Sequence, residues 1–408
     1  MNLYSSDQNL PDKTRYIPIM NLPARNEKKI RIVFLIRSLY FGGAERQLLT
    51  LVNGLNKVLF DPIVLCFYSG GELETEFAKN SVPIIHLEKK GRWDVFPFLI
   101  RLINQIQILN PDILHSYLSM SNILAVLVKI FIKKTRIVFG VRYAYMDLSK
   151  YDLLTRFVYM LEIFLSRFAD LVIVNSYTGK RNHIKNGFAS NRMIVIPNGI
   201  DTTQFYPSPA ERVEFRANHA ITAHSPLVGL VGRLDPVKDH STFIKAARIV
   251  LLEKPQVNFI CIGDGDTEYR EELKELAHHL GISEKIIWLE GQKNVRAVYN
   301  ALDICCSTSI GESFSNVIAE AMACSLPCVV TDVGDSALIL DDSGIVVPVG
   351  DDQTLAEGII NLLSLSASER LLLGVKGKQR IEKEFSVLRM IERTEKVLIN
   401  LKQGILTE

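Results

Sequence analysis

The sequence lacks a segment long and apolar enough to cross a membrane. Its best apolar stretch, residues 123–132, is interrupted by Lys129 and falls short of the ~18 residues that a spanning helix requires. Residues 1–29 lack the apolar core of an export signal, because charged residues and prolines are scattered through them. We therefore expect residues 1–29 to be a disordered extension. We expect the protein to be cytoplasmic, either free or bound peripherally at the inner face of the plasma membrane.

Cysteine is scarce and is not arranged to bind a metal. The six cysteines lie mostly in apolar segments, which is typical of buried thiols in a reducing compartment. Cys324 and Cys328 have no second pair of cysteines or histidines at the spacing of a zinc site. A dinucleotide fingerprint is also missing, because Gly229 and Gly232 lack the third glycine and Arg233 follows where a small residue is needed. The sequence thus argues against a zinc protein and against the common dinucleotide-binding motif.

The net charge of +2 conceals an uneven distribution. Residues 1–200 hold 26 Lys and Arg against 15 Asp and Glu, whereas residues 201–408 hold 21 against 30. A basic first half suits an anionic membrane surface or a phosphorylated lipid as a partner. The candidate contacts are four cations next to the apolar residues 123–131, namely Lys129, Lys133, Lys134 and Arg136. The alternative is a core helix whose cationic last turn compensates the helix dipole.

Strands and helices alternate in two series, which predicts two α/β domains with doubly wound parallel sheets. A chain of 408 residues also exceeds what one core usually supports. Continuous apolar runs predict strands at residues 30–36, 62–67, 82–86, 113–115, 136–141 and 171–175, and again at 227–231, 259–262, 286–289, 304–308, 328–331 and 345–347. Helical spacing of apolar residues predicts helices that include 44–55, 93–109, 153–168, 241–252, 268–280, 366–385 and 388–401. We expect a first domain at residues 30–200, a second at 201–385 and a final helical segment at 386–408.

A loop and short helix within residues 311–323 carry two carboxylates. An apolar strand precedes the loop and another follows the helix, so the loop lies at the carboxyl end of a strand, where parallel sheets bind ligands. The start of the helix, near Ser315 and Asn316, offers free N–H groups to an anion. Glu312 and Glu320 would lie up to about 12 Å apart, which suits the two ends of a nucleotide sugar. The alternative is a pair of solvated helix carboxylates.

Two cations follow another apolar strand. Residues 227–231 run into Gly232 and Arg233, and Lys238 lies five residues further on. Glycine lets the backbone approach a ligand closely, the guanidinium of Arg233 can bind two phosphate oxygens at once, and Lys238 adds a compact charge. The segment predicts a diphosphate site; the alternative is a surface turn with two solvated cations.

Together these segments resemble the retaining glycosyltransferases of the GT-B fold (group 1, or family 4), which include many bacterial polysaccharide and lipopolysaccharide enzymes. Smaller matches follow in the family's order: residues 42–46 (Gly-Gly-Ala-Glu-Arg), 175–176 (Asn-Ser), 196–201 (Ile-Pro-Asn-Gly-Ile-Asp), 262–265 and 289–291. The resemblance covers roughly residues 30–400. It implies two Rossmann-like domains facing each other across a cleft, with a C-terminal helix that crosses back to the first domain.

The resemblance implies a role for each matching residue. Arg233 and Lys238 would bind the donor diphosphate and stabilise the leaving group, Glu312 would contact the donor sugar, and Glu320 would accept hydrogen bonds from the ribose. Further donor-binding positions would make room for the donor, cradle its phosphates or meet its base. They are Gly42, Gly43, Gly232, Gly291, Gln292, Phe314, Ser315, Asn316 and Val317. No metal or other cofactor is implied, so Asp264-Gly265-Asp266 is not expected to be a metal-binding motif.

The sequence departs from the family pattern on the acceptor side of the cleft. Tyr117 stands where many relatives carry a histidine. The candidates for acceptor contact are therefore His115, Tyr117 and Arg142, with packing at the end of a strand as the alternative for His115.

Three further departures replace glycines of the family pattern. Ser325 follows Ala-Cys where glycine is usual, at a cost of about 1 kcal/mol if the turn needs a positive φ. Asp335 replaces a frequent second glycine after Gly334. Ser315 replaces another beside the phosphate, where its hydroxyl is able to cap the helix.

The sequence as a whole predicts a retaining glycosyltransferase. It would move a sugar from a nucleoside diphosphate sugar, UDP- or GDP-linked, to a glycan or a polyprenyl- or other lipid-linked saccharide in cell-surface polysaccharide synthesis, with no nucleic-acid partner. Two alternatives remain: a nucleotide-sugar 2-epimerase, which would convert the donor without an acceptor, and a non-catalytic nucleotide-sugar-binding subunit of a membrane assembly complex, which would bind without turnover.

Overall fold

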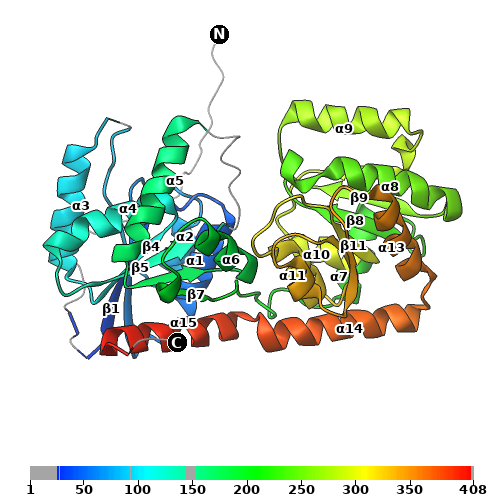
Figure 1. The fold of residues 1–408 in the computed structure, drawn as a ribbon. Helices are drawn as coiled ribbons and strands as arrows, with labels where there is room; N and C mark the ends of the chain where they lie inside the picture. The colour runs from blue at the N-terminus through cyan, green and yellow to red at the C-terminus, as the bar shows by residue number, and fades with distance from the viewer. Residues whose placement is uncertain (1–24, 27, 92, 144–151, 406–408) are drawn as a thin grey trace, which may run out of the picture.

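The computed structural model describes residues 25–26, 28–91, 93–143 and 152–405. These residues form two α/β domains, which lie next to each other and are connected along one side by the last two helices (Figure 1). Most of the predicted extension at residues 1–29 falls outside the described residues.

Each domain is built around a parallel sheet. Among the described residues, the first sheet has the strand order β3-β2-β1-β4-β5-β6-β7 and the second the order β10-β9-β8-β11-β12-β13. The strands of the first sheet are β1 (Ile30–Ile36), β2 (Phe60–Cys66), β3 (Ile84–His86), β4 (Ile113–Tyr117), β5 (Arg136–Val141), β6 (Leu171–Val174) and β7 (Met193–Val195). Those of the second are β8 (Leu227–Val231), β9 (Asn258–Ile262), β10 (Ile286–Leu289), β11 (Ile304–Ser307), β12 (Cys328–Thr331) and β13 (Gly344–Val347). In both sheets the order reverses beside the first strand, between β1 and β4 and between β8 and β11, and such sheets bind ligands at these points.

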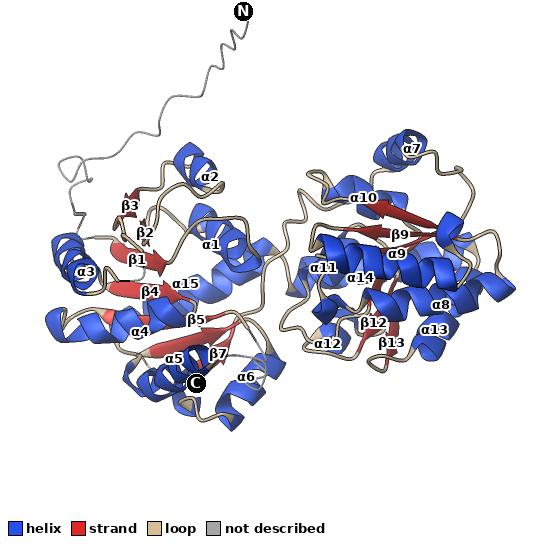
Figure 2. Ribbon diagram, turned by 90° about the horizontal axis from the view of Figure 1, so that it is seen from above, coloured by secondary structure: helices blue, strands red, loops and turns tan. Residues whose placement is uncertain are grey.

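Helices cover both faces of each sheet (Figure 2). In the first domain they are α1 (Gly43–Gly54), α2 (Glu74–Lys79), α3 (Phe96–Leu109), α4 (Ser119–Val128), α5 (Leu153–Leu165) and α6 (Tyr177–Lys185). The second half of the chain contains α7 (Pro209–Asn218), α8 (His240–Glu253), α9 (Thr267–His279), α10 (Val295–Ala301), α11 (Asn316–Ala323), α12 (Ser336–Leu340), α13 (Asp352–Ser364), α14 (Ala367–Glu384) and α15 (Val387–Gln403).

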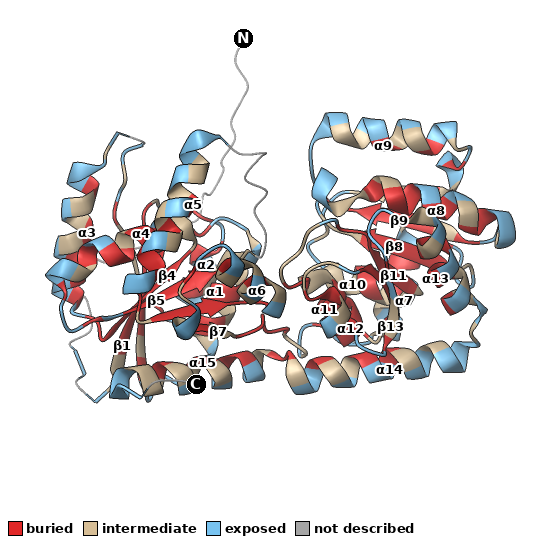
Figure 3. Ribbon diagram, viewed as in Figure 1, coloured by how far each residue is buried: buried red, intermediate tan, exposed pale blue. Residues whose placement is uncertain are grey.

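The strands are apolar along their whole length because both faces of each sheet are covered. In β1, Val33 and Leu35 pack under α3, α4 and α5, whereas Ile32 and Phe34 pack under α1 and α15. The burial of the strands is visible in Figure 3. Two-sided burial is what turns the period-2 pattern into continuous apolar runs.

The predicted fold class is confirmed, and the differences are local. β7 was not among the predicted strands, although it is as long as β3. The predicted helix at 93–109 begins only at Phe96, next to Pro97. The predicted helix at 153–168 is α-helical to Leu165 and ends in a tighter 3₁₀ turn, Ser166–Phe168. The predicted strand at 62–67 lies two residues earlier at its start, where Phe60 pairs with Ile30.

The last helix returns to the first domain. α14 packs on the second domain, and α15 contributes Met390, Ile391 and Leu398 to the core of the first. Ile391 fills the space beside Gly54 in α1. Among the described residues no single helix has the length and composition of a membrane span; the pair α13 and α14 meets both criteria together but is bent by 113°.

Candidate functional site at the carboxyl ends of the second sheet

The turn after β8 presents the two predicted cations. Gly232 continues the sheet by donating its N–H to Ile262, and Arg233 then projects into solvent, where its guanidinium lies 2.7 Å from the carboxylate of Asp235. Asp235 also accepts the N–H of Val237 and so begins the short turn Pro236–Lys238. The turn aims Lys238 at the loop after β11, and Thr308 fixes it by donating its hydroxyl to the Lys238 carbonyl at 2.8 Å.

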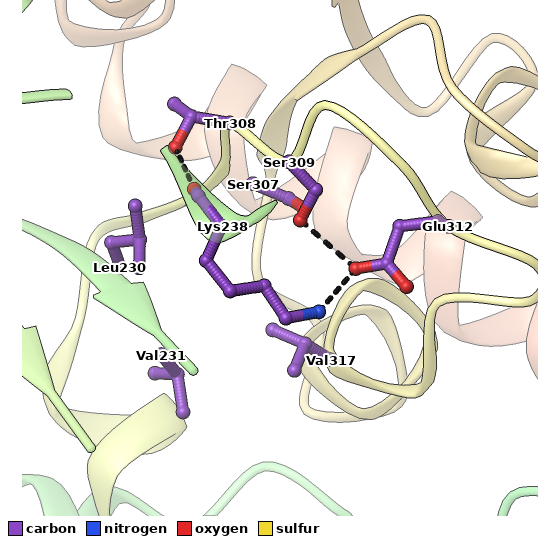
Figure 4. A pocket seen from close by; sticks show the side chains of 8 residues that line it. All are labelled: Leu230, Val231, Lys238, Ser307, Thr308, Ser309, Glu312 and Val317. Atoms are coloured by element: carbon purple, nitrogen blue, oxygen red, sulfur yellow. Dashed lines mark hydrogen bonds and ion pairs between the residues drawn. The ribbon is translucent and has the colours of Figure 1, made fainter. Parts of the chain in front are cut away.

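Lys238 and Glu312 meet across a small cavity (Figure 4). The ammonium of Lys238 donates to the Glu312 carboxylate, which also accepts the hydroxyl of Ser309 at 2.9 Å. The cavity is lined by the two charged residues together with the ends of β8 and β11 and the start of α11: Leu230, Val231, Ser307, Thr308, Ser309 and Val317. A cation and an anion from turns 74 residues apart in the chain therefore share one site.

Glu320 lies on α11, facing the other domain. It is 7% exposed and accepts the hydroxyl of Tyr299 at 2.9 Å, while Arg46 of α1 approaches its other oxygen at 3.8 Å. Burial raises the pKa of the Glu320 carboxyl, and the charge of Arg46 and the hydrogen bond from Tyr299 partly oppose that rise. The carboxylate is thus held at the edge of the interdomain space.

The start of α11 points at the start of α1. Ser315 is the N-cap residue, but its hydroxyl makes no capping hydrogen bond, so the capping role considered for it is not observed. The side-chain oxygen of Asn316 instead accepts from Asn198, at 3.0 Å, in the segment that connects the domains. Phe314, 5% exposed, packs against Phe385 and anchors the loop in the core.

Three glycines around this space are not required by the protein's own packing. A β-carbon on Gly43 would lie 4.0 Å from the Asn316 side chain, and one on Gly232 or Gly311 would have no atom nearer than 3.9 Å. By contrast, a β-carbon on Gly263 would collide with the Gly232 carbonyl oxygen at 1.9 Å. Room that the fold leaves empty beside a glycine is room for a ligand.

The remaining donor-side residues lie at the edges. Gly42 caps α1, and a β-carbon there would meet the Glu45 carboxylate. Gly291 donates its N–H to Asp264 at 2.9 Å, and the Gln292 amide folds back onto the Glu290 carbonyl. Asp266 caps α9, so the two aspartates of Asp264-Gly265-Asp266 both have structural partners.

The predicted acceptor-side residues are mostly buried. His115 and Tyr117 are completely inaccessible, and the His115 ring lies between Phe34 and Tyr117 with centroids 5.5 and 4.8 Å away. Burial, aided by the charge of Arg142, lowers the pKa of His115 well below its usual range, which keeps the ring neutral. Arg142 donates to the Tyr117 hydroxyl at 3.1 Å. This position favours the packing alternative for His115, and of the three residues only Arg142 is partly accessible.

Several residues at the domain interface were not assigned a role from the sequence. Tyr299 and Arg46 are the partners of Glu320, and Asp335 contacts the start of α6. Arg46 lies in the predicted glycine-rich motif, so its proximity to the cleft was foreseeable. Asp335 was noted only as a departure from the family pattern and Tyr299 was not noted, because their contacts with Tyr177 and Glu320 depend on the tertiary structure.

The arrangement has the chemistry of an anion site. Lys238 and the uncapped start of α11 border a space beside unobstructed glycines, the exposed Arg233 lies next to the turn that carries Lys238, and one carboxylate lies on either side of the helix start. Such a constellation neutralises a diphosphate while its carboxylates accept hydrogen bonds from hydroxyl groups.

Comparison with known proteins supports this reading. Residues 225–365 match the family model for glycosyl transferases group 1, and residues 41–204 match the model for glycosyltransferase family 4. The chain is 25% identical over 343 residues to an N-acetylgalactosaminyltransferase of Campylobacter jejuni that acts on an N-acetylgalactosamine-N,N'-diacetylbacillosaminyl-diphospho-undecaprenol; the match covers 80% of this chain and 88% of that protein. It is 31% identical to the D-inositol 3-phosphate glycosyltransferase of Nocardia farcinica, over 43% of this chain and 40% of that protein.

The fold has close structural counterparts. The structure of HepE from Anabaena in complex with UDP superposes with a TM-score of 0.81 at 22% identity, covering 91% of this chain and all of that one. Each family model matches one of the two domains. The group 1 model, on the second domain, includes Arg233, Lys238, Glu312 and Glu320, and the family 4 model, on the first domain, includes Gly42 and Gly43. The chain therefore belongs to the group 1 (family 4) glycosyltransferases and is a glycosyltransferase of the GT-B fold.

Proposed function

We propose that the protein transfers a sugar, with retention of anomeric configuration, from a nucleoside diphosphate sugar to a lipid-linked saccharide of a surface glycan. The observation that carries the donor half is the meeting of Lys238 and Glu312 at one cavity, beside glycines whose β-carbon positions are unobstructed and with the exposed Arg233 next to the turn that carries Lys238. The UDP complex of HepE supports a uridine donor, and the undecaprenyl-linked substrate in the name of the Campylobacter relative supports a lipid-linked acceptor.

Each charged residue has a role in this proposal. The side chain of Arg233 is exposed, so it is able to move from Asp235 to the diphosphate. Lys238 leaves Glu312 and binds the phosphate oxygen at which negative charge grows as the bond to the sugar breaks. Glu312, released by Lys238, then accepts hydrogen bonds from the sugar, and Glu320 accepts those of the ribose. With two cations and a helix start at the diphosphate, the proposed reaction uses no bound metal.

Nucleotide binding is the first test. Thermal unfolding is followed with UDP, GDP, ADP and dTDP, with and without EDTA, for the wild-type protein, Arg233→Ala and the control Arg248→Ala, which removes an exposed cation of the same domain. A nucleotide at 100 times its dissociation constant stabilises by about 2.7 kcal/mol. We expect one nucleotide to give an EDTA-resistant shift in the wild-type and control proteins that vanishes in Arg233→Ala. No shift with any nucleotide would refute the donor site.

Transfer is tested with the matching nucleotide sugar and lipid-linked saccharides. The product's anomeric coupling constant in NMR reports retention or inversion. Conversion of the donor without an acceptor would indicate the epimerase alternative, and binding without any turnover would indicate a non-catalytic subunit.

We propose further that the protein contacts a membrane surface through α5. The apolar segment chosen from the sequence, residues 123–131, is mostly α4, which packs as a core helix; Lys129 and Arg136 are both engaged with Asp170. In contrast, α5 and the turn after it expose an apolar row at helical spacing (Figure 3). The row is 49–81% exposed and consists of Leu153, Phe157, Met160, Phe164 and Phe168.

The inner face of α5 combines apolar and polar side chains. Tyr159 and Leu165 pack in the core of the first domain, and Glu162 is completely buried beside them, where it accepts hydrogen bonds from Asn122 at 2.7 Å and from Tyr143 at 2.6 Å. A helix in water normally exposes polar and charged side chains on its outer face. The apolar outer face of α5 is therefore suited to an apolar phase.

Cations at the border of this row favour an anionic bilayer over a protein partner. Arg167 lies over the Phe164 ring at 5.4 Å, and Lys133 and Lys134 are exposed next to the apolar Ile130 and Phe131. Each cation near an anionic surface contributes about 1 kcal/mol to binding. Vesicle flotation tests this: the wild-type protein should float with vesicles containing phosphatidylglycerol, whereas Phe157→Ser/Phe164→Ser should not, and the control Leu372→Ser, an exposed leucine of α14, should behave as wild type. If the double variant still floats with these vesicles, and its flotation depends on salt as that of the wild type does, the assignment is contradicted.

A further inference from the structure

Asp335 belongs to the second domain but completes the start of a helix in the first. The residue lies in the turn after β12 and is 3% exposed. Its carboxylate accepts the backbone N–H groups of Tyr177 at 2.7 Å and Thr178 at 2.8 Å. These are the first N–H groups of α6, which its own N-cap, Ser176, does not reach because that hydroxyl accepts from Gly179. α6 lies on the side of the first domain that is next to the second domain (Figure 1).

The same junction holds the donor loop. The N–H of Asp335 donates to the carbonyl of Ser313 at 3.0 Å, and Ser313 directly follows Glu312. The hydroxyl of Ser313 donates to the side chain of Asn175 at 2.6 Å and lies 2.8 Å from that of Ser176. Two residues of the first domain thus contact the loop that carries Glu312.

The turn before Asp335 is fitted closely to both partners. Gly334 has a φ of 57°, and a β-carbon on it would lie 2.5 Å from the Glu312 carbonyl oxygen. Its own carbonyl accepts the hydroxyl of Thr178 at 2.7 Å. Three segments, residues 312–313, 334–335 and 175–178, therefore form one hydrogen-bonded junction across the domain interface.

We propose that Asp335 is a positioning residue that couples the arrangement of the two domains to the donor loop. When the junction is formed, Glu312 is held against the first domain, where the acceptor binds; when the domains separate, the start of α6 loses its carboxylate and Ser313 loses its partners. A carboxylate at a helix start is favoured by both hydrogen bonding and the helix dipole. The coupling rests on the proposed function, but the junction itself does not.

The junction has a direct readout in amide exchange of the full-length protein. In Asp335→Asn the amide nitrogen cannot accept the second N–H, so the peptide covering residues 175–181 should exchange faster, while peptides from β12 and β13 should not change. Asp332→Asn removes an exposed carboxylate from the same segment and should exchange like the wild type. Unchanged exchange of residues 175–181 in Asp335→Asn would overturn the junction.

The coupling is read from kinetics of the same variants. Loss of the carboxylate that caps α6 should lower the population of molecules with the junction formed by about tenfold. We therefore expect kcat to fall by about tenfold. The KM for the donor should change less than threefold, because the cations that bind the diphosphate lie entirely in the second domain. Wild-type kcat in a variant with raised exchange would show that Asp335 only stabilises the interface and would overturn its positioning role.

A second variant covers a failure of Asp335→Asn to fold. Thr178→Val removes the hydroxyl that donates to Gly334 and accepts from Arg181 at 2.8 Å, and it changes the junction from the side of the first domain. It should show the same pattern at smaller amplitude, and wild-type exchange and kcat together would refute the proposal. If the wild-type protein itself transfers no sugar, the coupling falls with the proposed function, whereas amide exchange still decides whether the junction exists.

Discussion

A guanidinium nitrogen of Arg46 lies 3.8 Å from a carboxylate oxygen of Glu320, although the first belongs to α1 and the second to α11 of the other domain. Tyr299 holds the second oxygen of the same carboxylate at 2.9 Å. Burial raises the pKa of the Glu320 carboxyl, and one cation from across the interface and one hydroxyl from its own domain partly oppose that rise. Burial disfavours the charge of this carboxylate, so its position is unfavourable for the fold unless its partners offset the loss of hydration.

Replacing Glu320 by glutamine should stabilise the protein at neutral pH while weakening nucleotide binding. Burial raises the pKa of Glu320 in the folded state, so the folded protein holds its proton more tightly than the unfolded chain. Stability contributed by the protonated form is therefore lost as the pH rises from the ordinary pKa of about 4.3 through the raised value. The side chain in Glu320→Gln can still accept the Tyr299 hydroxyl but does not titrate, so the variant should not lose stability as the pH rises. Urea unfolding at pH 5 and pH 7 measures it.

The same variant should bind the nucleotide about tenfold or more weakly, because a hydrogen bond from ribose to a charged acceptor contributes about 1.5–3 kcal/mol. Arg46→Met serves as the companion variant: it leaves the carboxylate in place and should raise the pKa of Glu320 further. A Glu320→Gln protein with wild-type nucleotide affinity would contradict the ribose contact.

Glu312→Gln should change the affinities for nucleotide and nucleotide sugar in opposite directions. In the free protein the Glu312 carboxylate holds the Lys238 ammonium, so a diphosphate must compete for that cation. Pairs of this kind contribute about 0.2–1 kcal/mol, so UDP should bind up to about fivefold more tightly to the variant. The nucleotide sugar should bind more weakly, because its sugar hydroxyls lose an acceptor. Calorimetric titration with both ligands decides, and equal changes for the two would place Glu312 outside the sugar site.

The positions of the candidate donor-side residues in the fold were predictable because their signals are local. A glycine and two cations after an apolar strand, or two carboxylates flanking a helix start, are visible within a dozen residues, and the parallel-sheet pattern places both at the same edge. Asp335 was recognised as unusual, but its partner Tyr177 lies in the other domain, 158 residues away. Only the tertiary structure connects them.

The sequence predicts apolar helices more readily than it predicts which of them exposes its apolar side chains. Residues 123–131 have the highest local hydropathy and were the natural membrane candidate, yet α4 directs that character into the core. In α5, Tyr159, Glu162 and Leu165 face inward, hydrogen bonds to Glu162 fix this orientation, and the apolar row is left exposed. Which face packs depends on partners such as Asn122 and Tyr143, which the sequence pattern of one helix does not contain.

Three buried histidines should make the fold sensitive to mild acid. Burial lowers the pKa of His115 and His183, and burial together with the charge of Lys238 lowers the pKa of His240 to about 4. Below the ordinary pKa of about 6.5 the unfolded chain takes up protons that the folded protein refuses. Stability present above pH 6.5 is therefore lost as the pH falls, at up to about 1.4 kcal/mol per pH unit and histidine.

His115→Leu should reduce this dependence between pH 6.5 and 5, as measured by urea unfolding. The ring is completely buried and both of its nitrogens lack a hydrogen-bond partner, so a leucine of similar size loses no polar contact. His278→Leu, an exposed histidine of α9, is the matched control and should leave the dependence unchanged. The same variant separates the two readings of His115: retained kcat supports packing, and a large loss would restore it as an acceptor residue.

Ser325 adopts the backbone conformation for which a glycine is usual in the family. Its φ is 59°, which a residue with a β-carbon enters at a cost of about 1–2 kcal/mol. The turn cannot relax outward, because Gly374 of α14 passes so close that a β-carbon on it would lie 1.9 Å from the Ser325 carbonyl oxygen. The strain is therefore retained in the native state.

Ser325→Gly should raise the free energy of unfolding by up to about 1 kcal/mol. Relief of the left-handed strain exceeds the roughly 0.4–1 kcal/mol that the added freedom of glycine gives back to the unfolded chain. Ser325→Ala keeps the β-carbon and should show no such gain, so the difference between the two variants isolates the backbone contribution. Gly374→Ala should destabilise by more than about 2 kcal/mol, since the β-carbon would overlap backbone rather than a flexible side chain. Urea unfolding of the three variants measures these differences, and equal stabilities for Ser325→Gly and Ser325→Ala would show that the turn holds no strain.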